Sequence, residues 1–181
     1  MHIPACGPGE TLIGLSIPVP QPWAGELQLA RQNFGDPFAE LIPPHVTIIG
    51  PTVVADAQVS RLEEFLADVA AGTSPFRLRL RGTGSFRPTT PVVFVNVVEG
   101  GDACAALAER CRQLWLDQPL RFPFHPHVTV AQDVPDPQLE QAERELAGFE
   151  AAFEVPALLL SQQVEGGLWW IRRRFLFGGD Q

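Results

Sequence analysis

A five-residue pattern occurs twice in this chain and constrains its fold more than any other feature. Residues 44–48 read Pro-His-Val-Thr-Ile, and residues 126–130 read Pro-His-Val-Thr-Val. Side chains on a β-strand alternate between its two faces, so the histidine and the threonine of each copy share one face. The pattern therefore predicts an imidazole beside a hydroxyl in each half of the chain. Two such pairs can hold a phosphate between two proton-transfer groups.

The segments around the two motifs repeat in the same order. An apolar strand at residues 12–17 and another at residues 92–98 are each followed by a helical pattern and then by the motif. A second helix and a further strand follow each motif. The order strand, helix, strand, helix, strand therefore occurs twice. This duplication predicts an α+β fold of two pseudo-twofold-related lobes. We expect each lobe to be an antiparallel sheet with helices packed on its outer face, and the active-site cleft to lie between the lobes.

Domain and element boundaries follow from local signals. We expect a single bilobed domain over residues 1–181, with a first repeat over about 11–88 and a second over about 91–178. Asp56 and Asp102 are typical N-caps of the helices after them. The glycine- and proline-rich residues 82–91 are typical of a connection between lobes. Residues 153–160 and 168–177 each predict one strand.

The charge balance limits the partners that the chain can bind. Its net charge is −8, and the 13 basic residues are all arginine. An acidic surface argues against long duplex nucleic acid and against an anionic membrane. A small nucleotide or a short RNA terminus remains compatible, because a local pocket can attract a phosphate on an acidic protein.

Cysteine content and hydropathy suggest where the protein works. Cys6, Cys104 and Cys111 are too few and too irregularly spaced for a disulfide framework. No apolar run approaches the roughly 20 residues of a membrane-spanning helix. We therefore expect a cytoplasmic protein, and a monomer.

The four histidines differ in what they predict. His45 and His127 occupy corresponding places in the repeat, each two residues before a threonine, which favours a catalytic role over a structural one. His125 lies two residues before His127, a spacing that metal sites use. The residue corresponding to His125 in the first copy is Pro43, and no further ligand motif follows, so we expect no metal. His125 is expected to shape the strand entrance or to contact substrate.

The doubled His-x-Thr in a duplicated α+β chain resembles the two-histidine (2H) phosphoesterase superfamily over nearly the whole sequence. That superfamily includes bacterial 2′-5′ RNA ligases and RNA 2′,3′-cyclic phosphodiesterases. The resemblance implies that His45 and His127 are catalytic, that Thr47 and Thr129 bind the phosphate oxygens, and that no metal or cofactor is required. Residues 129–132 read Thr-Val-Ala-Gln, whereas the ligase-like members tend to read Thr-Leu-Ala-Arg. The chain departs from that subgroup at Val130 and Gln132.

The expected activity is that of a phosphoric diester hydrolase in RNA processing. It would act without a metal on 2′,3′-cyclic phosphate ends of RNA or on small cyclic nucleotides, and the same histidine pair could run in reverse as a 2′-5′ RNA ligase. The alternative hypothesis is a noncatalytic protein that binds a nucleotide or an RNA end in the same cleft. A metallohydrolase is the third hypothesis. Arg173 shares a strand face with apolar residues and needs a partner, either substrate phosphate or an internal carboxylate.

Overall fold

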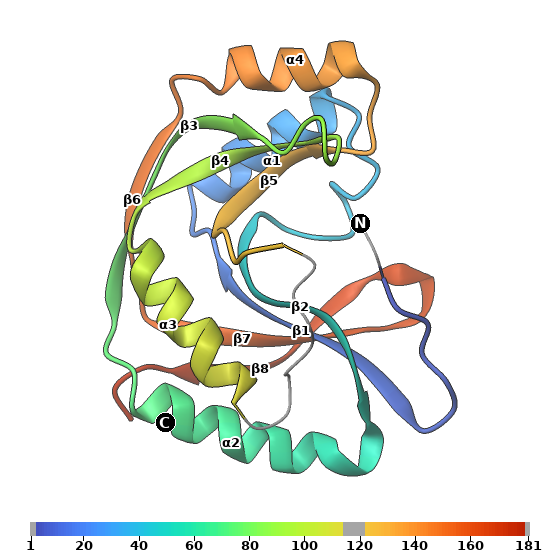
Figure 1. The fold of residues 1–181 in the computed structure, drawn as a ribbon, viewed down its shortest axis with the longest axis vertical. Coiled ribbons are helices and arrows are strands. Elements are labelled where there is room, and N and C mark those ends of the chain that lie inside the picture. The colour runs from blue at the N-terminus through green and yellow to red at the C-terminus, as the bar shows by residue number, and fades with distance from the viewer. Residues whose placement is uncertain (1–2, 114–121, 180–181) are drawn as a thin grey trace.

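The strands and helices follow one another much as the repeat predicts. The computed structural model describes residues 3–113 and 122–179, which form a curved eight-stranded sheet and four α-helices (Figure 1). The strands are β1 (Glu10–Pro18), β2 (His45–Ala55), β3 (Phe76–Ser85), β4 (Val92–Glu99), β5 (His127–Gln132), β6 (Glu150–Val155), β7 (Ala157–Gln163) and β8 (Trp169–Leu176). The helices are α1 (Trp23–Asn33), α2 (Val59–Ala71), α3 (Gly101–Arg112) and α4 (Asp136–Glu145).

The order of strands in the sheet places the two motifs at its centre. The order is β6-β3-β4-β5-β2-β1-β7-β8, and every neighbouring pair is antiparallel. The motif strands β2 and β5 touch through one residue pair, Val46 with Val128. Strands β2, β1, β7 and β8 form the His45 lobe, and strands β5, β4, β3 and β6 form the His127 lobe. The predicted two-lobed α+β fold is confirmed.

The two lobes are not the two halves of the sequence. Strand β3 comes from the first half but pairs with β4 and β6 in the His127 lobe. Strands β7 and β8 come from the second half but complete the His45 lobe. The helices cross over as well, since α1 packs against β5 and α3 packs against β2. Each half of the chain therefore supplies part of the other lobe.

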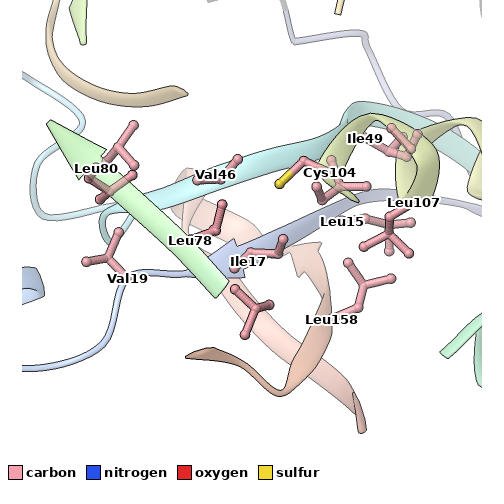
Figure 2. Packing of buried hydrophobic residues seen from close by; sticks show 14 of the residues in the cluster. Leu15, Ile17, Val19, Val46, Ile49, Leu78, Leu80, Cys104, Leu107 and Leu158 are labelled. Atoms are coloured by element: carbon pink, nitrogen blue, oxygen red, sulfur yellow. The ribbon is translucent and has the colours of Figure 1, made fainter. Parts of the chain in front are cut away.

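The hydrophobic core lies on the sheet face opposite the motif histidines. Val46 and Val128 are fully buried, and each of the four helices turns a buried leucine toward this core: Leu27, Leu62, Leu107 and Leu139. Figure 2 shows Cys104 and Leu107 of α3 beside Leu15 and Val46. Burial raises the pKa of both Cys104 and Cys111 to about 12, which makes these thiols packing groups. The helices thus leave the opposite face free for the site.

Two predicted boundaries are wrong. Residues 153–160 form two strands, because the chain leaves β6 in the His127 lobe at Val155 and enters β7 in the His45 lobe at Ala157. Pro156 between them has no N–H for a sheet ladder, which suits a break in pairing. Residues 82–91 are also no connection between lobes. They lie within the β3–β4 hairpin of the His127 lobe.

The two predicted N-caps are also wrong. Helix α3 begins at Gly101 after Gly100, whose φ of 84° is left-handed, and a Cβ at Gly100 would lie 2.3 Å from the Arg77 carbonyl oxygen. Asp102 lies in the first turn. Asp56 begins a short 3₁₀ turn ahead of α2, and its carboxylate accepts a hydrogen bond from the Thr11 hydroxyl. Both acidic residues therefore lie near a helix start without capping it.

Among the residues that the structure describes, none of the helices has the length and apolar character needed to span a membrane. The apolar stripe of the helix predicted after Asp102 extends in the sequence to Trp115, and that residue lies outside the described part of the chain.

Candidate active site

The pairing of β2 with β5 brings the two motifs onto one face of the sheet. Val46 pairs with Val128 in an antiparallel register, so continuing by one residue places Thr47 beside His127 and His45 beside Thr129. Because the two valines point into the core, these four side chains point to the opposite face. The sequence-predicted histidines and threonines thus form a quartet, each histidine facing the threonine of the other lobe.

The two histidine rings are held in the same way. His45 Nδ1 lies 2.7 Å from the carbonyl oxygen of Pro43, and His127 Nδ1 lies 2.6 Å from the carbonyl oxygen of His125. A carbonyl can only accept, so each Nδ1 carries the proton and donates it. Nε2 of each neutral ring is therefore the free basic nitrogen. In His45 this nitrogen lies 3.1 Å from Thr47 Oγ1.

Burial sets the protonation of both rings. It lowers the pKa of His45 below the ordinary histidine value. The hydrogen bond to the Pro43 carbonyl raises this pKa, and the nearby positive charge of Arg31 lowers it further. Burial likewise lowers the pKa of His127, where repulsion from His125 and from His45 adds to it and the carbonyl of His125 opposes it. Both rings favour the neutral form.

The surroundings of His127 are aromatic. The Phe86 ring lies edge-on to His127 with centroids 4.9 Å apart, and the Phe94 ring lies 5.1 Å from it. His125 packs against the same two phenylalanines at 5.5 and 5.3 Å. The structure therefore brings His125 beside the second motif, where it shapes the strand entrance and lines a cavity. Its contact with substrate stays a prediction.

Two cavities flank the quartet and meet at Thr47 and Gly50. The first has a volume of about 390 Å³, lies over the His45 lobe and includes His45 in its lining. The second has a volume of about 500 Å³, lies at the His127 lobe and includes His125, His127 and Arg112. A phosphate held at the quartet would have room for a substituent on either side.

A buried ion pair behind the first motif was missed in the sequence analysis. Arg31 of α1 and Asp36 are almost fully buried, with Arg31 Nε 3.0 Å from Asp36 Oδ2. Arg31 Nη1 also donates to the carbonyl of Ile42, and Asp36 Oδ1 accepts from the backbone N–H of Phe38. These bonds fix the loop that carries Pro43 to His45. Arginine followed five residues later by aspartate is too common a pattern to have predicted this.

Arg173 lies away from the quartet. Its Nη1 lies 3.5 Å from Glu63 Oε2 on α2, and its guanidinium lies 5.0 Å over the Phe175 ring. It does not line either of the two cavities described above. An internal carboxylate thus supplies the partner that this arginine needs. A role of Arg173 in substrate binding has no contact here to support it.

No cluster of three histidine, cysteine, aspartate or glutamate side chains that could hold a metal ion occurs within residues 3–113 and 122–179. The chemistry that the quartet itself offers is proton transfer by two imidazoles and hydrogen bonding by two hydroxyls.

Comparison with known proteins decides the family. A sequence model described as the 2′-5′ RNA ligase superfamily matches residues 18–167, which is most of the chain and includes both His-x-Thr motifs. The chain belongs to the 2′-5′ RNA ligase superfamily. The resemblance to two-histidine phosphoesterases that the doubled motif predicts is thereby confirmed.

Individual proteins and solved structures are also similar to this chain. A Bacillus pumilus protein named "Putative phosphoesterase" is 31% identical over 147 residues, covering 80% of this chain and 85% of its own length. Among solved structures, TT0787 of Thermus thermophilus superposes with a TM-score of 0.68 at 20% identity, covering 94% of this chain and 100% of its own. A structure of E. coli LigT complexed with NADP+ superposes with a TM-score of 0.66 at 17% identity, covering 93% and 99%. These structural likenesses show the shared two-lobed fold.

Proposed function

We propose that this superfamily member is a metal-independent phosphodiesterase that opens 2′,3′-cyclic phosphates on RNA ends or on small nucleotides. One observation carries the proposal. The pairing of β2 with β5 puts the two imidazoles on one sheet face, and each donates its Nδ1 proton to a backbone carbonyl and keeps Nε2 for chemistry. A noncatalytic binder would need hydrogen-bond donors but not two matched titrating groups.

The quartet supports a complete hydrolytic step. Water attacks phosphorus from one side, and one neutral imidazole accepts its proton at Nε2. The P–O bond to a ribose oxygen breaks on the opposite side, and the other imidazole, protonated at Nε2, donates its proton to that oxygen. Thr47 and Thr129 donate hydrogen bonds to the nonbridging oxygens, whose charge distribution changes in the transition state. The products are a phosphomonoester and the freed ribose hydroxyl.

Ligation follows from the same arrangement with a different nucleophile, while the 3′ oxygen leaves and takes a proton from the second imidazole. A 5′-hydroxyl in place of water would give a 2′-5′ linkage from the same pair of proton-transfer groups, so 2′-5′ RNA ligation belongs to the proposal. E. coli LigT has been crystallised with NADP+ and with 3′-AMP, which supports a small nucleotide as the ligand of this chain too. A cytoplasmic, monomeric protein that processes RNA ends is part of the same proposal.

The experiment compares His45→Ala and His127→Ala with the unaltered protein on a 2′,3′-cyclic mononucleotide. Loss of one general acid or base costs about 10²- to 10⁴-fold in rate, so each variant should lose most turnover. Turnover by the unaltered protein should survive EDTA, because the quartet needs no cation. Formation of the phosphomonoester is followed by chromatography.

Leu29→Ala serves as the control, because Leu29 is an exposed side chain on α1 that contacts neither cavity. It should keep wild-type turnover. Turnover at the wild-type rate in either histidine variant would contradict the proposal, and so would its complete loss in EDTA.

A further inference from the structure

The two lobes are similar in backbone but differ sharply in what fills their inner faces beside the quartet. In the His45 lobe, Ser16 of β1 pairs with Thr47 of β2. In the His127 lobe, Phe94 of β4 pairs with Thr129 of β5. Ser16 and Phe94 are therefore equivalent under the pseudo-twofold relation. A serine stands in one lobe where a phenylalanine ring stands in the other.

In the His127 lobe the phenylalanine fills the position that corresponds to Ser16. Phe94 is buried and packs on Phe86 with ring centroids 4.3 Å apart, and both rings contact His127. Gly84, which pairs with Phe94 on β3, makes room for the ring, because a Cβ there would lie 2.7 Å from Phe94 Cε2. This inner face is thus packed with the protein's own aromatic rings.

The corresponding face of the His45 lobe is hollow. The cavity of about 390 Å³ lies over Gly14 and Ser16 of β1 and Ser161 and Leu159 of β7, so three of the four paired floor positions carry small residues. Trp169 forms a wall that packs against Gly14, where a Cβ would lie 3.3 Å from the indole ring. This cavity, here called the slot, thus lies beside a tryptophan and includes Thr47 in its lining.

The lining of this cavity indicates the character of its ligand. It contains no aspartate, glutamate, lysine or arginine, and its surface is mainly apolar. Trp170 and Ile171 at its rim are each 65% exposed, large apolar groups left in water. The Ser16 and Ser161 hydroxyls face the slot, and neither makes a side-chain hydrogen bond within the described residues. An uncharged flat ring with polar atoms at its edge fits an apolar slot with hydroxyls in its floor.

We propose that the slot over Gly14, Ser16 and Ser161 is the subsite for the nucleobase of the substrate, so that a nucleotide binds with its base in the His45 lobe. The proposal rests on the proposed function, since it takes the quartet as the phosphate site. Ser16 adjoins Thr47 in the pairing of β1 with β2, so the slot begins next to the phosphate position. Phe94 occupies the corresponding position in the His127 lobe, and the cavity of about 500 Å³ there lies to one side of it, beside Phe86 and the charged Arg112.

Two substrates separate base binding from phosphate chemistry. A 2′,3′-cyclic mononucleotide and ethylene phosphate share the five-membered cyclic diester, but ethylene phosphate has no base. The measured quantity is the ratio of kcat/KM for the nucleotide to kcat/KM for ethylene phosphate. Ser16→Phe places in the slot the residue that fills the other lobe. It should lower this ratio about tenfold or more, the scale of one lost base-stacking contact.

Trp170→Ala is the second variant, chosen because an exposed edge-strand residue can be truncated without opening the core. It should lower the same ratio, whereas Leu29→Ala, an equally superficial truncation on α1, should leave it unchanged. If Ser16→Phe and Trp170→Ala both keep the wild-type ratio, the base does not bind in the slot and the inference is overturned.

Equilibrium dialysis tests the subsite without turnover. Nucleoside 3′-monophosphate should bind the unaltered protein more tightly than inorganic phosphate does, and Ser16→Phe should weaken nucleotide binding about tenfold more than phosphate binding. Nucleotide and phosphate affinities that fall in parallel would overturn the subsite. A protein that turns over neither substrate but still shows this selective loss would retain the subsite and lose the proposed function, so the two failures are distinguishable.

Discussion

At the scale of single residues, the site depends on how two imidazoles are oriented. Each motif histidine donates its Nδ1 proton to the carbonyl of the residue two positions earlier. This bond is compatible with both roles, because it leaves Nε2 to accept a proton in the neutral ring and to donate one in the protonated ring. The residue before each histidine is a proline, which has no N–H and favours an extended conformation at the position before it. The sequence of each motif therefore helps to set the orientation of its own histidine side chain.

The lowered histidine pKa values predict an acidic optimum for kcat/KM. In the proposed mechanism the active form has one neutral and one protonated imidazole, and it is most populated between the two apparent pKa values of the pair. Burial lowers the pKa of both His45 and His127 below about 6.5, so the maximum should lie below that pH. Activity should fall at higher pH as the acid loses its proton and at lower pH as the base gains one.

Steady-state kinetics on a 2′,3′-cyclic mononucleotide across the pH range measures this profile, since the diester itself stays a monoanion there. A bell-shaped pH profile with its maximum on the acidic side would agree with the lowered histidine pKa values. A plateau that extends unchanged into alkaline solution would be at odds with any need for a protonated histidine.

The sequence predicted the quartet but not its supports. Alternation along a strand is enough to place each histidine beside its threonine, so Thr47 and Thr129 could be named in advance. The Arg31–Asp36 pair could not, because its meaning depends on burial and on a carbonyl eleven residues beyond Arg31, at Ile42. Contacts of this kind arise from packing and leave no local pattern.

At the scale of elements, the β3–β4 hairpin supports His127. Gly84 lies against the Phe94 ring, and Phe94 in turn packs on His127. Asn96 on the same strand donates to the carbonyl of Gly82 across the hairpin. The position of the second imidazole therefore depends on a glycine two strands away in the sheet.

Gly84→Ala should destabilise the protein and lower its activity together. The added Cβ would lie 2.7 Å from Phe94 Cε2, and relieving that overlap moves a ring that contacts His127. Overpacking of this kind costs about 1–3 kcal/mol of unfolding free energy. Thermal unfolding and kcat/KM on a cyclic nucleotide measure the two effects.

Gly148→Ala is the matched control, because no heavy atom lies within 4 Å of a Cβ there. It should change stability by less than about 0.5 kcal/mol and leave kcat/KM unchanged. Equal behaviour of the two variants would show that Gly84 does not support the site.

Element boundaries were predicted less well than element order, for reasons that lie in tertiary structure. Residues 153–160 are a continuous apolar run, and nothing local says that the chain changes lobes at Pro156. Helix α3 starts with a left-handed glycine that contacts the Arg77 carbonyl of a neighbouring strand. The aspartates near α2 and α3 fit the sequence pattern of an N-cap, but other residues occupy the N-cap position of each helix.

At the scale of the whole molecule, each lobe contains strands from both halves of the sequence. A sequence repeat predicts two similar units but not which strand joins which sheet, because pairing partners depend on long-range packing. Here β3, from the first half, pairs in the His127 lobe, while β7 and β8, from the second half, pair in the His45 lobe. Neither half of the sequence can complete its own sheet. We therefore expect the lobes to unfold together as one domain.

Denaturant unfolding measures this cooperativity with two probes. Far-UV circular dichroism follows the sheet and helices of both lobes. Tryptophan fluorescence follows the four tryptophans of the chain, among them Trp23, which packs on Phe153 of the His127 lobe, and Trp169 and Trp170 in the His45 lobe. The two transitions should coincide at one midpoint. Separate midpoints would mean that the lobes fold independently despite the exchanged strands.

The central claim is that two histidines from different parts of the chain flank one phosphate. Titration of the histidine ring signals by NMR, with and without a bound nucleoside 3′-monophosphate, tests it most directly. In the free protein the signals of His45 and His127 should titrate below pH 6.5, as burial requires. A bound phosphate should raise the pKa of both together, because an adjacent anion favours each imidazolium. A rise at one ring while the other stays unchanged would contradict the shared site.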